Sequence, residues 1–460
     1  MIAPIPERRP LLGRPPRRRL RSSGVSPPGR AAVWIDRLRG HAFLRGVAVV
    51  VGGTAAAQLI TLAFSPLITR LYGPEIFGVQ GIFLAAVGLV LPFANLAYGA
   101  SIVLPATDNE ARALFRLSVL ISLAVTALST LVFGIFHRDI AEAIGFTAPS
   151  QLLWLAPVTI LVIAVAQPFH HWLARKKQFG ALSRISVAEA TIVGGAKTAV
   201  GFVAATAPVL LASVALAGLL KLALLWTSAR DTLVPGKRAD QDPPVPLRDV
   251  AYRYRDFPLF RAPHDWLNGL SHNIPSLMLA ALVGPVAAGF YVLSYRVVSL
   301  PITVISAAVG TVFLPRIAEA SHRSERLRPL LLKGTAALAA VGLLPFGIMI
   351  AFAPWLFSLV FGVEWTAAGD YARWLSLWFY IVFIGSPAYQ AIPILGLQGH
   401  LLAYEIVVLA LRTSALAVGA FVYQDGTVAV ALFAVVGMLV NISQIGWCIF
   451  SCDRRLRSGI

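Results

Sequence analysis

Six ionisable residues lie inside long apolar segments of the chain: the bases Lys197, Lys221, Arg296 and Arg412 and two acids. A charge at such depth in a membrane costs at least ~2.5 kcal/mol and normally faces an interior cavity. Lysine and arginine in a cavity favour an anion, and the planar guanidinium suits phosphate oxygens. We therefore predict that the four bases contact an anionic substrate. The alternatives are snorkelling of the lysines to an interface and structural pairing of the arginines.

The two acids are Glu189 and Glu405, each one to two turns from the predicted cytoplasmic end of its segment. Glu405 and Arg412 are seven residues apart and share a helix face, whereas Glu189 and Lys197, eight apart, match less closely. A carboxyl group that exchanges protons there permits proton coupling, so both acids are candidate coupling residues. Structural pairing and sugar contact remain alternatives.

Uncharged polar residues supply further candidates. His272 and Asn273 are adjacent on one predicted span and could bind sugar hydroxyls, although interhelical hydrogen bonds are the commoner use of such residues. Pro92, Pro301 and Pro387 interrupt helical hydrogen bonding and are candidate hinges or static kinks.

The sequence carries no signature of an enzyme. There is no G-x-x-x-x-G-K-[ST] motif for ATP. His170 and His171 have no carboxylate or cysteine at ligand spacing, and Cys448 and Cys452 face a reducing cytoplasm. We therefore expect no catalytic residues, no cofactor, no metal and no disulfide.

The segments around these residues define the class of protein. Only 13% of the 460 residues are charged and 57% are hydrophobic, against about 25% charged in a soluble domain. Apolar runs of twenty or more residues, long enough to cross a bilayer as helices, recur along the chain. We predict an all-α integral membrane protein with about twelve transmembrane helices, at 46–70, 79–104, 113–136, 151–173, 182–204, 208–229, 264–283, 287–314, 332–360, 371–395, 401–422 and 428–450.

The net charge of +18 is distributed as in a membrane protein rather than a nucleic-acid-binding one. Among 39 Lys and Arg residues, only Arg70, Arg138 and Arg373 fall in predicted external loops. This asymmetry places both termini in the cytoplasm. Residues 1–45 are rich in Arg and Pro and are predicted to form a disordered basic tail near anionic lipid. Residues 451–460 form a second cytoplasmic tail.

A repeated pattern indicates how the spans are organised. G-P-x-x-x-G occurs at residues 73–78 and again at 284–289, each in a predicted external turn and each followed at similar spacing by a proline and an "LP" pair. We infer two parallel six-helix lobes, 46–230 and 264–450, around a central cavity, joined by a cytoplasmic linker at 231–263. Parallel repeats of this kind are a transporter architecture.

Several segments resemble the polysaccharide-biosynthesis flippases of the multidrug/oligosaccharidyl-lipid/polysaccharide exporter superfamily. They include "LITRLYGPEIFGVQGIFLA" (67–85), "GASIVLP" (99–105), "WLARKKQFG" (172–180), "FLPRIAEA" (313–320) and "FGVEWTAAGDYARWLSLWFY" (361–380). The resemblance covers nearly all of residues 46–450 in order. It implies translocation of a polyprenyl-diphosphate-linked oligosaccharide across a bacterial inner membrane for cell-surface polysaccharide synthesis, with glycan polymerase or export machinery as possible partners.

Three other functions stay open. A multidrug cation antiporter of the same superfamily would favour acidic cavity residues, yet the buried bases outnumber the buried acids four to two. A membrane glycan polymerase or ligase would need a large external loop, and the longest predicted here is about fourteen residues (137–150). A non-transporting scaffold is the third.

Overall fold

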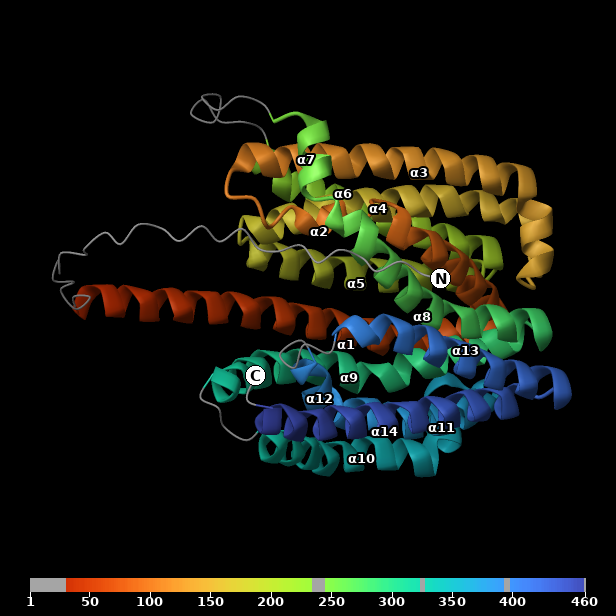
Figure 1. Cartoon of the computed structure of the whole chain (residues 1–460). Helices are drawn as coiled ribbons and strands as arrows, with labels where there is room; N and C mark the ends of the chain where they lie inside the picture. Colours follow the sequence, from red (N-terminus) through yellow and green to blue (C-terminus); the bar gives the residue numbers. More distant parts are fainter. Residues whose placement is uncertain (1–29, 234–244, 323–326, 393–397, 459–460) are drawn as a thin grey trace, which may run out of the picture. The chain divides into compact units, whose positions relative to one another are not determined.

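The computed structural model describes residues 30–233, 245–322, 327–392 and 398–458. These residues are almost entirely helical and contain no strand, which confirms the predicted all-α class (Figure 1). The chain divides into two compact units, Met1–Gly46 and Val47–Ile460, and the cavities described below lie in the second. The helices of the chain, in order, are α1 (Arg30–Val90), η1 (Leu91–Phe93), α2 (Tyr98–Ser101), α3 (Asp108–Ala143), η2 (Ser150–Trp154), α4 (Leu155–Arg175), α5 (Phe179–Val203), α6 (Ala207–Leu233), α7 (Leu247–Arg253), η4 (Phe257–Arg261), α8 (Ala262–Leu282), α9 (Pro285–His322), α10 (Leu327–Phe361), η5 (Val363–Trp365), α11 (Thr366–Ile384), α12 (Ser386–Ala391), α13 (Gln398–Val422) and α14 (Gly426–Ser458).

The helices follow the predicted spans, but the count of twelve is not reached. Among the described residues, eight helices are long and apolar enough to cross a membrane. The first of these, Val49–Phe93, contains the first predicted span and most of the second. α5, α8 and α11 are not among the eight. α5 carries Arg184, Glu189 and Lys197, which shows how polar groups lower the apolar signal of a helix that lines an interior.

Helix α1 begins earlier than the sequence suggested. The predicted disordered tail extended to residue 45, whereas α1 is helical from Arg30 onward. The last proline of the tail is Pro28, and the segment after Arg30 is rich in Ala, Leu and Arg, which favour helix. Residues 1–29 lie outside the described residues, so the prediction for them stays open.

The second predicted span, 79–104, is interrupted. After α1 ends at Val90, the chain forms the short η1 and a turn before α2. Leu96 (φ 48°) and Ala97 (φ 60°) in that turn adopt left-handed backbone conformations, which are rare for residues with a side chain. A span expected to be one helix is therefore a discontinuous one.

The two G-P-x-x-x-G motifs meet in space. The opening glycines, Gly73 (φ 65°) and Gly284 (φ 127°), both have positive φ, so each turns the chain as only glycine does easily. The closing glycines, Gly78 and Gly289, bring two backbones together. A Cβ on Gly78 would overlap the Pro285 carbonyl oxygen, and one on Gly289 would lie 3.0 Å from the Gly78 nitrogen.

Further contacts join the two halves of the chain beside this crossing. The Trp365 indole donates a hydrogen bond to the Thr69 carbonyl (3.3 Å), and Phe77 packs edge-on against the same ring at 5.4 Å. Arg70 donates to the Leu359 carbonyl (2.8 Å). Side chains from both halves share one buried cluster that includes Tyr72 and Phe357. The division into two six-helix lobes itself stays a prediction.

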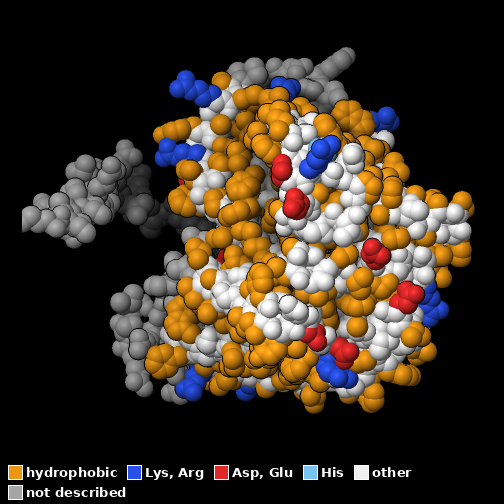
Figure 2. Space-filling model, turned by 90° about the vertical axis from the view of Figure 1, so that its right-hand side faces the viewer, with side chains coloured by type: hydrophobic (Ala, Val, Ile, Leu, Met, Phe, Trp, Pro, Cys, Tyr) orange, Lys and Arg blue, Asp and Glu red, His pale blue; other side chains and the backbone are white. Residues whose placement is uncertain are grey.

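Large apolar side chains are exposed along most of the helices, as lipid-facing surfaces require. Leu128, Ile135, Leu344, Trp355 and Phe421 are each at least half exposed. Figure 2 looks onto the ends of the helices, where hydrophobic side chains are widespread and acids and bases are scattered between them. A water-soluble protein rarely exposes so much contiguous apolar surface, so this surface supports a bilayer as the solvent.

The close approach of the backbones at Gly78 and Gly289, called the glycine crossing below, leaves no space for a side chain. Gly78→Ala should lower thermal stability by about 1–3 kcal/mol, because the new Cβ has no space and the backbones must separate. Gly347→Ala is the matched control, since nothing lies within 4 Å of its Cβ position and alanine favours helix. Melting of the purified protein in detergent measures both. Equal melting temperatures would contradict the crossing.

Candidate functional site

A cavity of about 370 Å³ brings together three of the four predicted bases. Lys197 of α5, Lys221 of α6 and Arg296 of α9 all line it, together with Glu189. The charge on its walls is therefore net positive. Arg296 lies roughly 14 Å along its predicted span from the external end, at ~1.5 Å per residue, yet its side chain is solvent-accessible. The surface through which it is accessible is that of the cavity it lines.

Glu189 makes an ion pair inside this cavity, but not with the residue that shares its helix. Its Oε2 lies 3.0 Å from the Lys221 Nζ on the neighbouring α6. Glu189 and Lys197 are eight residues apart along α5, too far for direct contact, so structural pairing of Glu189, an alternative the sequence left open, is made across to α6 while both residues line the cavity. Lys197 and Arg296 remain as the bases of the cavity that make no ion pair with a described acid.

The cavity also has a hydrogen-bonding wall that was not anticipated. Thr54, Gln58, Thr61 and Ser65 line it from α1. They are four, three and four residues apart, which is the spacing of one helix face. A single hydroxyl or amide in an apolar span does not indicate a site. The helical spacing of these four residues is the sequence signal that could have identified them as one polar face. Gln80 and Ser186 add to the same lining.

Arg412, the fourth predicted base, does not line this cavity. Its guanidinium lies 4.0 Å from the centroid of Trp378 and 4.2 Å from that of Phe433, two rings that also pack edge-on against each other. The residue is 8% exposed, and its Nε has no hydrogen-bond partner among the described residues. Cation–π contacts stabilise a guanidinium in such a place. Its surroundings are those of a packed structural residue.

The remaining predicted contacts lie elsewhere. Glu405 Oε2 is 3.5 Å from His264 Nδ1 on α8, an ion pair only when the histidine is protonated. His272 hydrogen-bonds the Tyr295 hydroxyl (2.6 Å), and the Asn273 amide donates to the Gly269 carbonyl (2.8 Å). None of these lines the cavity around Lys197. The roles in coupling and sugar contact stay predictions.

The three candidate hinges differ in their setting. Pro92 lies in η1, where the helix is broken. Pro301 lies inside α9, which continues from Pro285 to His322 without interruption. Pro387 lies in the first turn of α12, directly after the end of α11 at Ile384. The chain is thus discontinuous at two of these prolines and continuous at the third, so Pro301 does not end its helix.

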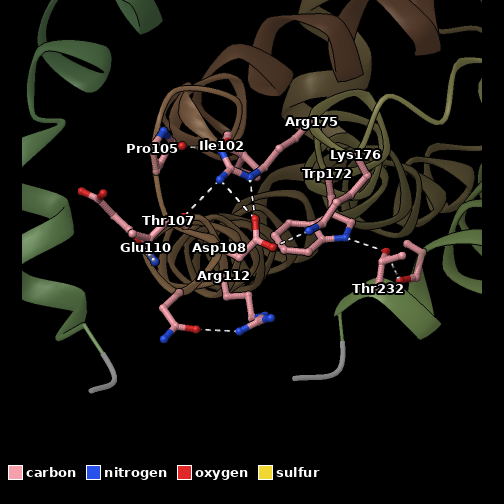
Figure 3. Close-up of polar contacts among 12 residues, drawn as sticks. Ile102, Pro105, Thr107, Asp108, Glu110, Arg112, Trp172, Arg175, Lys176 and Thr232 are labelled. Carbon is pink, nitrogen blue, oxygen red and sulfur yellow. Dashed lines mark hydrogen bonds and ion pairs between the residues drawn. The ribbon is translucent and has the colours of Figure 1, made fainter. Parts of the chain in front are cut away.

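An ionic network joins the ends of α3 and α4 to α6, the helix that carries Lys221 into the cavity wall (Figure 3). Arg175, at the end of α4, donates to Asp108 at the start of α3 (3.2 Å) and to the carbonyls of Pro105 (2.6 Å) and Thr107 (3.1 Å). Lys176 pairs with the same carboxylate. The Trp172 indole donates to Thr232 at the end of α6 (3.0 Å). These bonds fix the ends of α3, α4 and α6 relative to one another.

The segment between the two halves is anchored to this network. Arg253 of α7 forms an ion pair with Glu110 of α3 (2.9 Å), and the Tyr98 hydroxyl donates to the Ala251 carbonyl (3.0 Å). Burial, and secondarily the Glu110 carboxylate, raise the pKa of Tyr254, so this phenol stays neutral. The predicted linker therefore contains a docked helix, while residues 234–244 lie outside the described part.

Comparison with known proteins assigns the chain to a family. A family model described as polysaccharide biosynthesis protein matches residues 67–370. The chain belongs to the polysaccharide biosynthesis protein family. Within the curated proteins, it is 22% identical over 279 residues to the teichuronic acid biosynthesis protein TuaB of Bacillus subtilis (strain 168). That match covers 60% of this chain and 55% of the relative, so the chain spans about half the length of the curated relative it matches.

Solved structures define the fold of this polysaccharide biosynthesis protein. The inward-facing conformation of a multidrug resistance MATE family transporter of the MOP superfamily matches with a TM-score of 0.58 and 15% identity, over 89% of this chain and 95% of that one. A MOP superfamily transporter from Pyrococcus furiosus matches with a TM-score of 0.56 and 15% identity, over 90% and 96%. The chain thus has a MOP-transporter fold, and the expected family resemblance is confirmed.

The different settings of Arg296 and Arg412 yield a paired prediction. Arg296→Gln should weaken binding of inorganic diphosphate about tenfold or more, because it removes a charge-assisted hydrogen bond at the cavity wall. Arg412→Gln should change that affinity less than about threefold, since the residue does not line the cavity. Calorimetric titration of the purified proteins measures both constants. The reverse ranking would place the anion near Arg412.

Proposed function

We propose that this polysaccharide biosynthesis protein is a flippase for polyprenyl-diphosphate-linked oligosaccharide. The cargo would pass from the cytoplasmic to the periplasmic leaflet of a bacterial inner membrane by alternating access. The observation that carries the proposal is the cavity in which Lys197, Lys221 and Arg296 face a single acid, Glu189. A diphosphate cannot cross hydrocarbon without such compensation of its charge.

The walls of the cavity match the other parts of the cargo. Hydroxyl and amide groups at Thr54, Gln58, Thr61 and Ser65 provide hydrogen bonds near the anion site, as the first sugar of a glycolipid requires. The polyprenyl chain needs no polar path and can stay in the bilayer. Both termini are proposed to be cytoplasmic, in agreement with the distribution of Lys and Arg.

A multidrug cation antiporter is the second candidate, because the MATE transporters share this fold. A cationic substrate would meet two bases without a described acidic partner in the cavity, which opposes its binding. In the transporter from Pyrococcus furiosus, a reverse polarity of the binding pocket suggests a different function of that protein. Polarity of the pocket is likewise the property on which the present proposal depends.

Reconstitution in liposomes separates the two functions. One set of liposomes carries a polyprenyl-diphosphate oligosaccharide with a fluorescent sugar, whose exposure to an external quencher is followed, and a parallel set carries a cationic dye. Wild-type protein should scramble the glycolipid and leave the dye in place. Arg296→Gln should slow scrambling about tenfold or more, by loss of the phosphate contact.

The control for this experiment removes a charge elsewhere. Lys333→Gln neutralises an exposed base on α10 and should leave the scrambling rate unchanged. Movement of the dye without movement of the glycolipid would support the antiporter instead. Absence of both movements from well-folded protein would contradict transport.

A further inference from the structure

A second polar cavity lies at the break between α1 and α2. It has a volume of about 320 Å³, at the lower end of the ~300–1,000 Å³ typical of ligand pockets. Pro92, Asn95 and Ala97 line it from the broken segment, and His171 and Gln167 line it from α4. Arg261 at the end of η4 and Asp265 in the first turn of α8 complete it. The first cavity, lined by Lys197, Lys221 and Arg296 and called the cationic cavity below, shares none of these residues.

The polar groups of this second cavity offer both donors and acceptors. The buried Asn95 donates its amide to the Gln167 carbonyl oxygen (2.8 Å), which leaves the Asn95 oxygen and the Gln167 amide for another partner. The His171 ring lies on the same wall, and a Cβ on Gly99 would lie 3.7 Å from its Cδ2 and 3.3 Å from the Asn95 amide. The small residue at 99 therefore leaves space beside both polar groups.

The charges of the second cavity balance. Arg261 and Asp265 form an ion pair of 3.5 Å, and both side chains are about half exposed. One base and one acid give the cavity no net preference for an anion or a cation. A neutral ligand with many hydroxyl groups satisfies such a mixture of donors and acceptors, whereas a diphosphate would find its charge compensated better beside Lys197 and Arg296.

The backbone here is strained in a way that tight packing must maintain. Left-handed conformations at residues such as Leu96 and Ala97 are unfavourable and tend to cluster at functional sites. Phe93 packs against Trp266 with centroids 5.7 Å apart, which holds the broken segment against the start of α8. Discontinuous helices form the substrate sites of many transporters, because the break exposes polar groups at membrane depth.

The second cavity and the first are linked by a series of shared lining residues. Gln167 lines it together with a third cavity of about 380 Å³, and Glu189 and Lys221 line both that third cavity and the cationic one. A single elongated molecule with an anionic part and a hydroxyl-rich part would find matching chemistry along this series. We propose that the cavity lined by Asn95, Gln167, His171, Arg261 and Asp265 binds the oligosaccharide part of the cargo, apart from the diphosphate. This inference rests on the proposed function.

Two probes representing the halves of the cargo test the inference on the full-length protein in nanodiscs. One is the free oligosaccharide released by mild acid from the lipid extract of the source strain, and the other is farnesyl diphosphate. Gln167→Leu should weaken oligosaccharide binding about tenfold, since it removes hydrogen bonds to the sugar. The affinity of the Gln167→Leu variant for farnesyl diphosphate should stay within about twofold of the wild-type value.

A second variant tests the same cavity in case Gln167→Leu misfolds, and a third controls for the replacement of glutamine by leucine itself. Asp265→Ala alters a half-exposed side chain and should weaken oligosaccharide binding several-fold without affecting the fold. Gln390→Leu makes the same substitution as Gln167→Leu in α12, away from both cavities, and should leave both affinities unchanged. Lys197→Gln should weaken farnesyl diphosphate binding and spare the oligosaccharide.

The outcomes separate this inference from the proposed function. Unchanged oligosaccharide affinity in both Gln167→Leu and Asp265→Ala would overturn the sugar site, as would loss of oligosaccharide binding in Lys197→Gln alone. Wild-type protein that binds farnesyl diphosphate and scrambles glycolipid but does not bind the oligosaccharide would also overturn it, while the flippase stands. If wild-type protein binds neither probe and does not scramble glycolipid, both the sugar site and the proposed flippase function are overturned.

Discussion

The backbone contact between Gly78 and Gly289 is the constraint on which the rest of the arrangement depends. Each glycine is the last residue of one copy of the repeated motif. At each, the opposing backbone fills the space that a side chain would need. Because the backbones touch there, α1 and α9 are fixed relative to each other. Arg296 is seven residues after Gly289 on α9, and Lys197 on α5 accepts a hydrogen bond from Tyr72 of α1 at its carbonyl (3.1 Å). The crossing thereby helps to bring bases from both halves of the chain to one cavity.

Charge burial explains why the bases differ in their surroundings. A base in an apolar span needs either a polar cavity, an acid or an aromatic ring, because each replaces part of the lost hydration. Lys221 has Glu189, Arg412 has Trp378 and Phe433, and Arg296 has the cavity. Buried charge alone therefore does not distinguish the bases that line the cavity from the base that does not. The partners of each charge, which come from other helices, decide its role.

The sequence predicted the positions of the helices better than the contacts between them. Apolar length located the helices, and the repeated motif located the glycines that meet, because both depend on local composition. The break at 91–97 escaped prediction, since Leu96 and Ala97 carry no local signal for a left-handed backbone and only tertiary packing imposes it. The pairing of Glu189 with Lys221 likewise depends on how α5 lies beside α6, which spacing along one helix cannot reveal.

The two copies of the repeated motif differ in the helix that follows them. Pro92 and Pro301 follow their motifs at similar spacing, yet the helix is broken at Pro92 and continuous through Pro301. A broken helix exposes amide and backbone groups that a continuous helix satisfies internally. Both polar cavities described above draw most of their lining from the first half of the chain, and the second half contributes Arg296 to one and the start of α8 to the other. The polar lining of both cavities thus comes mainly from residues before 230, and residues after 260 contribute fewer side chains.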